Sequence, residues 1–161
     1  MPDARSGNCN GRTQGGSNAE IVIADAFVKG LPNIDYHLAL EAMLKDATIP
    51  PGGNEEAEGR GGLIPYLELG YIPYGIPRAG NRTIEYSYCD YTIALVAKGL
   101  GKTDLYQQYL KQSSNWKNLW RADYEHAGVK GFILPRDKEG NWLDKIPFGN
   151  SHIQKPTFTY T

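Results

Sequence analysis

The first apolar stretch of the chain predicts a helix that other parts of the protein enclose. Residues 17–30 read SNAEIVIADAFVKG, and their central part is apolar on nearly every face of a helix. Ser17 and, three residues later, Glu20 have the spacing of a capping box, and Gly30 supplies a stop signal. The pattern therefore predicts a buried helix that begins near Ser17 and ends before Gly30.

A second helix follows after a short break. Residues 35–47, DYHLALEAMLKDA, place Leu40, Met43 and Leu44 at helical spacing. Asp35 or Asn33 is a suitable N-cap, and two prolines beyond the segment end it. These two helices form an αα-hairpin.

Residues 51–82 are rich in Gly and Pro and read as a long connection, with one short helical turn near Tyr66 to Leu69. A connection of this length inside a domain is usually functional or poorly ordered. We therefore expect it to matter for a binding site if the chain has one.

The next segment, TIEYSYCDYTIALVAKGLGK at 83–102, predicts another helix that is apolar over most of its circumference. Strand alternation fails at Tyr91, whereas helical spacing aligns Ile84, Tyr88, Tyr91 and Leu95 as one packing stripe. A second hairpin partner covers residues 103–120, and residues 131–143 read as two short strands around an Asp-Lys-Glu-Gly turn. The predicted fold class is therefore mainly α, made of αα-hairpins, with a short β-hairpin near residues 131–143.

Composition narrows the function classes. The chain has 161 residues, enough for one domain, and 17 basic against 18 acidic residues, so nucleic-acid binding is not expected. No apolar run is long enough for a membrane span, and the first residues hold no secretory signal. Eleven Tyr and three Trp suit a sugar-binding surface, but composition alone favours the explanation that the tyrosines fill half-buried packing positions.

Candidate chemistry is concentrated in carboxylates on the apolar helices. Glu85 and Asp90 lie on the second enclosed helix, and Glu20 lies in the first turn of the other. A buried carboxylate is costly unless it is paired or hydrogen-bonded. These side chains either line a site or make structural hydrogen bonds, and both interpretations stay open here.

Cysteine and histidine add little. Cys9 and Cys89 are too few for a disulfide framework, although a bridge between them is possible. His37, His126 and His152 are scattered without the spacing of metal ligands.

Several sequence blocks, taken in order, resemble glycoside hydrolase family 92. They are GGSNAEIVIADAFVKG, GRGGL with LGYIP, RTIEYSYCDYTIALVAKGLGK and GFILPRDKEGNW, and they extend over nearly the whole chain from residue 15. The resemblance implies a calcium-dependent, inverting exo-α-mannosidase acting on mannose-containing N-glycans, secreted as a full-length protein. It also implies an (α/α)6 toroid packed against an N-terminal β-sandwich, of which residues 1–161 would be one internal part of the catalytic domain.

The resemblance also places residues near the substrate. The N-terminal parts of the enclosed helices would face the toroid mouth, with Ser17, Asn18, Glu20, Arg82, Glu85, Tyr86 and Asp90 near the ligand. One departure is Cys89-Asp90, because the family usually has two adjacent acids there. With the two helices parallel, we expect Glu20 and Glu85 to lie nearer each other than either lies to Lys45.

No catalytic residue is assigned. The family's general acid lies in a Gly-Asn-Glu-Pro motif and its base in an Asp-Asp pair, and neither is expected in this chain; GNEE at 53–56 is a coincidental match. Most calcium ligands would also lie elsewhere, so we expect calcium in the full-length family but none bound by this chain alone. The prediction is an inactive segment of a mannosidase. A non-catalytic carbohydrate-binding remnant and a structural helical fragment remain the alternatives.

Overall fold

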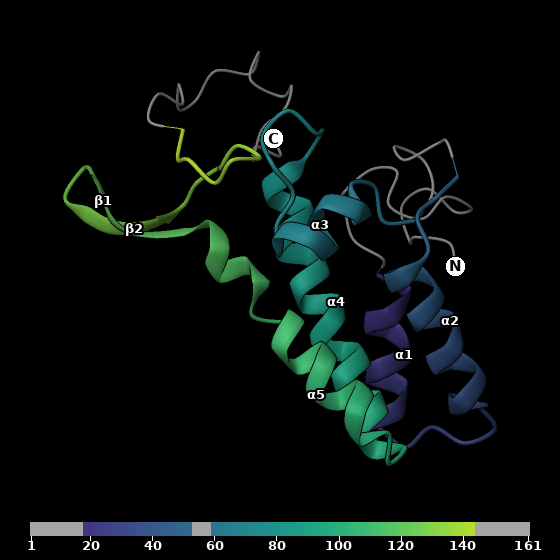
Figure 1. Cartoon of the computed structure of the whole chain (residues 1–161). Helices are drawn as coiled ribbons and strands as arrows, with labels where there is room; N and C mark the ends of the chain where they lie inside the picture. The colour runs from purple at the N-terminus through teal and green to yellow at the C-terminus, as the bar shows by residue number, and fades with distance from the viewer. Residues whose placement is uncertain (1–17, 53–58, 144–161) are drawn as a thin grey trace.

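The structure is a computed structural model that describes residues 18–52 and 59–143. Within these residues the chain is mainly helical, as the sequence predicts, with a small antiparallel sheet near the C-terminal end (Figure 1). In chain order the elements are α1 (Ala19–Val28), α2 (Tyr36–Thr48), α3 (Leu63–Leu69), α4 (Ala79–Gly99), α5 (Thr103–Gln112), the 3-10 helix η1 (Asn115–Leu119), β1 (Trp120–His126) and β2 (Val129–Ile133). None of these helices is both long and apolar enough to cross a membrane.

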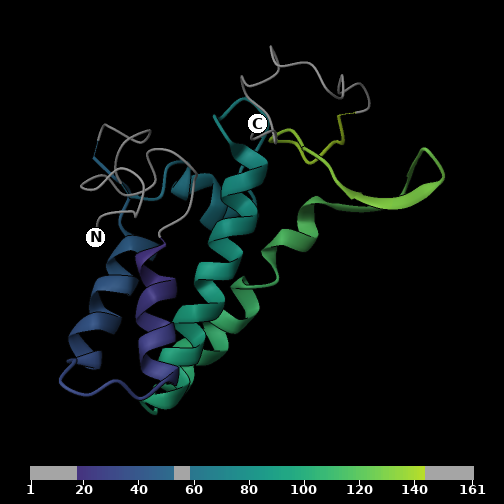
Figure 2. The same cartoon turned by 180° about the vertical axis from the view of Figure 1, so that it is seen from behind.

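Two helical hairpins, α1–α2 and α4–α5, lie side by side. In both views the connections that follow α1 and α4 lie at the same end of the molecule, so these two helices run parallel, as predicted (Figures 1 and 2). The main core between the hairpins consists of Ala24, Leu40, Met43, Ala47, Ile93, Ala94, Val96, Ala97 and Tyr109. A Cβ added at Gly99 would overlap the ring of Phe27, so glycine permits the close approach of α1 to the end of α4.

The predicted cap of α2 is confirmed, whereas the predicted capping box of α1 is wrong. The Asp35 carboxylate accepts a hydrogen bond of 3.0 Å from the backbone N–H of Leu38. At α1 the N-cap is Asn18, whose side chain makes no capping bond, and Glu20 is fully buried instead. Ser17 lies outside the described residues. The Glu20 carboxylate has a stronger partner in the interior, as shown below.

Helix α4 differs from its prediction in two ways. It begins at Ala79, four residues before Thr83, because packing of its first turn outweighs the weak helix propensity of Gly80. The packing stripe faces outward: Ile84, Tyr88 and Tyr91 are 38, 51 and 41% exposed, and Leu95 is half-buried. The other faces of α4 are covered instead.

The small size of the covered residues explains this reversal. The buried positions of α4 include Thr83, Ser87, Thr92, Ala94 and Ala97. Small side chains allow neighbouring helices to approach closely, and hydroxyl groups can bond to the helix's own carbonyls: Ser87 Oγ donates to the Thr83 carbonyl oxygen at 2.7 Å. The hydrophobic pattern alone therefore predicted the wrong face of α4 as the buried one.

The C-terminal part forms a hairpin that starts earlier than the sequence indicates. α5 ends at Gln112, and the residues predicted to continue it as a helix form η1 and then β1. β1 and β2 pair antiparallel across Ala127 and Gly128, both with positive φ (49° and 79°), as a two-residue type I′ loop requires. The predicted Asp-Lys-Glu-Gly turn is present beside it and closes an isolated bridge between Arg136 and Trp142.

Stacked arginines and aromatic rings fasten this turn to the helical body. The guanidinium carbon of Arg136 lies 5.3 Å from the ring centre of Tyr71 and 4.8 Å from that of Trp142. Arg121 of β1 lies 5.7 Å from the same Trp142 ring. Arg136 also accepts a 2.7 Å hydrogen bond at its backbone carbonyl from the N–H of Tyr74. Cation–π contacts and a backbone bond thus hold the loop after α3, the turn and the hairpin together.

Apolar side chains of α1 and α4 are exposed where no described element covers them. In α1, Val22 and Val28 are each 68% exposed, so the enclosure expected for this helix is incomplete in this chain. The outward stripe of α4 adds three more large side chains. An apolar surface of this kind normally marks a contact with another structure.

We therefore predict that the isolated 161-residue chain exposes apolar surface in solution. It should bind a hydrophobic dye such as ANS and self-associate as its concentration rises, because water-exposed apolar side chains favour contact with each other. Dye fluorescence and sedimentation velocity are the measurements. A monodisperse monomer that binds no dye would contradict this.

Candidate functional site

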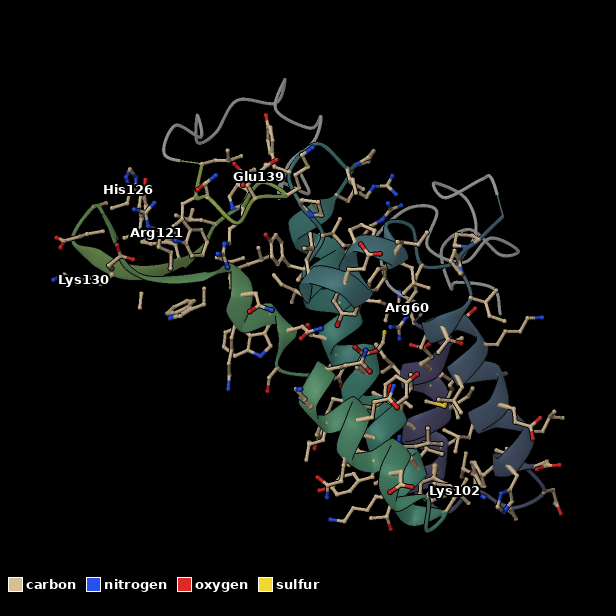
Figure 3. All side chains as sticks on the ribbon, in the orientation of Figure 1. Arg60, Lys102, Arg121, His126, Lys130 and Glu139 are labelled. Carbon is tan, nitrogen blue, oxygen red and sulfur yellow. The ribbon has the colours of Figure 1, made fainter. Side chains whose placement is uncertain are left out.

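Arg60 is the centre of a buried ionic cluster that joins three separate parts of the chain. Its Nη2 lies 2.9 Å from Glu20 Oε2 of α1, and its Nη1 lies 2.7 Å from Asp90 Oδ1 of α4. All three side chains are buried to within 1% of complete. In Figure 3 the labelled Arg60 lies next to α3, at the end of the α1–α2 hairpin that contains the start of α1.

Tyrosines complete the cluster. Tyr66 of α3 donates its hydroxyl proton to Asp90 Oδ2 at 2.7 Å, so both oxygens of this carboxylate are bonded. Tyr86 of α4 lies with its ring 5.1 Å from the Arg60 guanidinium carbon, and the Tyr66 and Tyr86 rings meet edge to face at 5.5 Å. The guanidinium is therefore held by two carboxylates in its plane and an aromatic ring over its face.

The glycines that follow Arg60 allow the backbone to bring this side chain into the space between α1 and α4. Tyr86 donates its hydroxyl proton to the Gly61 carbonyl oxygen at 3.1 Å. Gly62, the N-cap of α3, has φ 73°, and a Cβ there would lie 3.1 Å from Ile72 Cγ2. A left-handed backbone in such a tight space favours glycine. The segment can thus turn directly from Arg60 into α3, which then presents Tyr66 to Asp90.

The electrostatics follow from burial. Burial acts to lower the pKa of Arg60, but the carboxylates of Glu20 and Asp90 outweigh this effect and raise that pKa well above its usual value. Burial, with the Asp90 carboxylate, raises the pKa of Tyr66 far above its ordinary range, and burial does the same to the pKa of Tyr86. Arg60 is therefore permanently cationic and both phenols remain neutral donors at physiological pH.

The structure brings together part of the predicted site. Glu20, Tyr86 and Asp90 meet at Arg60, as described above. Arg82 is buried one turn earlier on α4, close enough that its charge lowers the pKa of Tyr86 in opposition to burial. Asn18 begins α1 and is half-buried, and Ser17 lies outside the described residues.

Glu85 is half-buried, and burial raises its pKa. The position of Glu85 and the other predicted residues near substrate stays a prediction, as does the spacing of Glu20, Glu85 and Lys45.

Sequence reasoning missed Arg60 and the hydrogen-bonding role of Tyr66. A signal for Arg60 was nevertheless present. Acids on apolar helices need a counter-charge, and GRGGL places an arginine among glycines in the connection that leads into the next helix. Buried carboxylates should therefore have directed the search toward arginines in neighbouring loops.

The described residues do not fit a calcium site. Calcium takes six to eight oxygen ligands, several of them usually carboxylates. Within residues 18–52 and 59–143 no group of three or more His, Cys, Asp or Glu side chains is placed to hold a metal. The buried carboxylates of Glu20 and Asp90 are bonded to Arg60, and the Cys89 thiol is buried.

An open pocket lies on a different face, between α4 and the end of α5. It has a volume of about 330 Å³ and is lined by Ile84, Ser87, Tyr88, Tyr91, Ser113 and Trp116. Half of its lining residues, Ile84, Tyr88 and Tyr91, belong to the outward stripe of α4.

The paired hairpins define an (α/α)-type helical array, which is the fold type of solved glycosidases similar to this chain. This chain belongs to glycosyl hydrolase family 92, whose catalytic domain matches residues 1–159. An "uncharacterized secreted glycosidase" of Arthroderma benhamiae is 44% identical over 169 residues, which cover 95% of this chain and 22% of that protein.

Solved structures agree with the family. The inverting mannosidase of this family from Bacteroides thetaiotaomicron is 33% identical, with a TM-score of 0.78 over 91% of this chain and 19% of its own. A second α-mannosidase from that organism, solved in complex with mannoimidazole, is 31% identical, with a TM-score of 0.69 over 82% of this chain and 16% of its own. The chain thus spans about a fifth of the length of these relatives.

We predict that Arg60→Met destabilises the fold by about 3–5 kcal/mol at neutral pH, because two buried carboxylates lose their counter-charge. The loss of stability should be smaller in acid, where protonation removes the uncompensated negative charge. Urea unfolding followed by circular dichroism measures the free energy of unfolding of both proteins. The matched control is the triple variant Arg60→Met, Glu20→Gln, Asp90→Asn, which leaves no buried charge in the cluster and should recover most of the loss. An Arg60→Met variant as stable as the parent would show that the cluster is not structural.

Alkaline titration should distinguish the buried tyrosines. Burial, with a contribution from Asp90, raises the pKa of Tyr109 to about 12, and the pKa values of Tyr66 and Tyr86 are raised too. An unfolded tyrosine ionises near pH 10, so the stability that these phenols contribute is fully present below about pH 10 and is lost as the pH rises through the folded-state values.

As the pH rises, tyrosinate absorbance should therefore appear first from the exposed tyrosines, and the buried tyrosines should ionise only as the helical signal is lost. Tyr109→Phe should remove one of the tyrosines that ionise at the higher pH. A single ionisation step for all tyrosines, with helical content unchanged, would contradict this.

Proposed function

We propose that this chain forms part of the catalytic domain of an inverting α-mannosidase. The observation that carries the proposal is the likeness, at 31% identity over 82% of this chain, to an α-mannosidase solved with mannoimidazole. In the proposed full protein the helical hairpins contribute to an (α/α)6 toroid next to a β-sandwich. Its substrate is a mannose-containing glycan, such as an N-glycan, and the protein is secreted, in agreement with the name of the fungal relative.

The Arg60 cluster argues for a structural role of this segment rather than a catalytic one. Inversion requires two carboxyl groups about 6.5–9.5 Å apart, one acid and one base, with room for a water at the anomeric carbon. Glu20 and Asp90 are instead bonded to one guanidinium and fully buried. A carboxylate held in this way cannot exchange a proton with a substrate oxygen.

The acid, the base and the calcium ligands are therefore proposed to come from other parts of the full-length protein. The segment's own contribution is to form a wall of the substrate pocket and to fix the start of α1 relative to α4. Asn18, Arg82 and Glu85 are the described residues that would face the sugar, since they lie at the same ends of the two parallel helices.

We predict that the purified 161-residue chain does not hydrolyse α-mannosides, because Glu20 and Asp90 are bonded to Arg60 and the acid and base are proposed to come from other parts of the full-length protein. The assay is release of mannose from an aryl α-mannoside with calcium present. The matched positive arm is a chimera of the Arthroderma relative in which this chain replaces the region it matches; this protein should release mannose, with the β-anomer appearing first by NMR. Calcium-dependent release by the 161-residue chain alone would refute its inactivity, and an inactive but folded chimera would refute the mannosidase assignment.

A further inference from the structure

One tripeptide of the sequence, Asn81-Arg82-Thr83, matches the acceptor motif for N-linked glycosylation. The motif does not occur elsewhere among the 161 residues. It bears on this chain because the proposed protein is secreted, and in secreted proteins such a motif is normally read as a surface loop that carries a glycan. The structure places the motif in different surroundings.

The motif lies at the start of α4 and not in a loop. α4 begins at Ala79, directly after Arg78, whose φ of 59° turns the chain sharply into the helix. Arg82 and Thr83 are 2% and 0% exposed, and Asn81 is half-buried. Positions two apart in a helix do not face each other, so the side chains of Asn81 and Thr83 point to different sides of α4. An enzyme at the surface therefore cannot contact both of them at once.

The Thr83 hydroxyl has a structural role inside the protein. Its Oγ1 donates a hydrogen bond to the Ala79 carbonyl oxygen at 2.8 Å and accepts one from the backbone N–H of Ile72 at 2.9 Å. Ile72 is also buried, so release of the hydroxyl would leave a buried N–H without its acceptor. Thr83 thus joins the segment after α3 to α4, and its hydroxyl cannot serve recognition by an enzyme while α4 is folded.

Glycan transfer needs both ends of the motif, because an asparagine is an acceptor only with Ser or Thr two residues later. The donor is an oligosaccharide linked to a lipid diphosphate. Asn81 Nδ2 would attack C1 of the first sugar and form the N–C1 bond. The bond between C1 and the diphosphate oxygen would break, the lipid diphosphate would leave with the electron pair, and the amide proton would pass to a base of the transferase.

We propose that Asn81 is a glycosylation site of the unfolded chain only: it accepts an N-glycan before α4 forms, and folding of α4 closes the site. Modification and folding then compete for the same residues. The proposal takes secretion from the proposed function and is independent of the enzymatic activity.

The test measures glycan transfer to the purified 161-residue chain by an oligosaccharyltransferase supplied with a lipid-linked oligosaccharide. Asn81→Gln is the blank, because it removes the acceptor. Ser87→Pro keeps the motif but places a proline in the interior of α4, which removes a helix hydrogen bond and clashes with the preceding turn. The parent, with its helical signal verified by circular dichroism, should accept the glycan at least about tenfold more slowly than Ser87→Pro, because its motif opens only by local unfolding.

Asp35→Thr is the matched control for access to a folded chain. It converts the exposed residues Asn33-Ile34-Asp35, between α1 and α2, into a second acceptor motif. Threonine is also a suitable N-cap for α2 in place of aspartate. The folded variant should carry one glycan, and peptide mass spectrometry should locate it at Asn33.

Each other outcome would overturn the proposal. Transfer to Asn81 of the folded parent at the rate seen for Asn33 would show that α4 does not close the site. Absence of transfer to Ser87→Pro would show that the motif is not an acceptor in any state. Failure at Asn33 would show that the folded chain is a poor acceptor everywhere and that α4 has no specific effect. Because the assay involves no mannoside hydrolysis, an inactive full-length protein would refute the proposed function alone.

Discussion

The position of Arg60 determines how the described helices are arranged. A guanidinium buried among apolar residues is stable only with anionic partners, and a carboxylate in the same interior needs a cation. Glu20 and Asp90 come from helices of different hairpins, so each needs the loop that carries Arg60 to reach the space between them. The cluster thus fixes α1 against α4 and, through Tyr66, α3 against both. Such a cluster contributes more to the specific arrangement of the helices than to the net stability of the fold.

Sequence reasoning predicted those elements whose signals are local. The Asp35 cap, the helix over α2 and the helical reading of TIEYSYCDY depend on residues close together in the chain, and the structure confirms each. The parallel direction of α1 and α4 was expected from the family resemblance, which implies that the enclosed helices begin at the same mouth of a toroid. Where the prediction failed, the deciding contact was distant in sequence. Glu20 lies 40 residues from the arginine that binds it, so its nearest explanation was a capping box.

Two other failures have separate physical reasons. α4 has apolar residues on several faces, so periodicity could not say which face is covered; the close packing of small residues decided this. The β1–β2 hairpin was missed because its turn is Ala-Gly rather than Asn-Gly, and Ala127 adopts a positive φ that few alanines accept. Neither feature could be read from a single sequence without knowing the partner segments.

The same helix therefore has two kinds of surface with opposite requirements. Toward the α1–α2 hairpin, α4 places Asp90 and Tyr86 in a polar cluster around Arg60, followed by a compact set of small apolar residues. Away from it, α4 presents large aromatic and aliphatic side chains to solvent. A polar cluster fails when one partner is removed, whereas an apolar face gains stability with each unit that covers it. The segment is thus internally specified on one side and dependent on its neighbours on the other, as expected of one unit in a helical array.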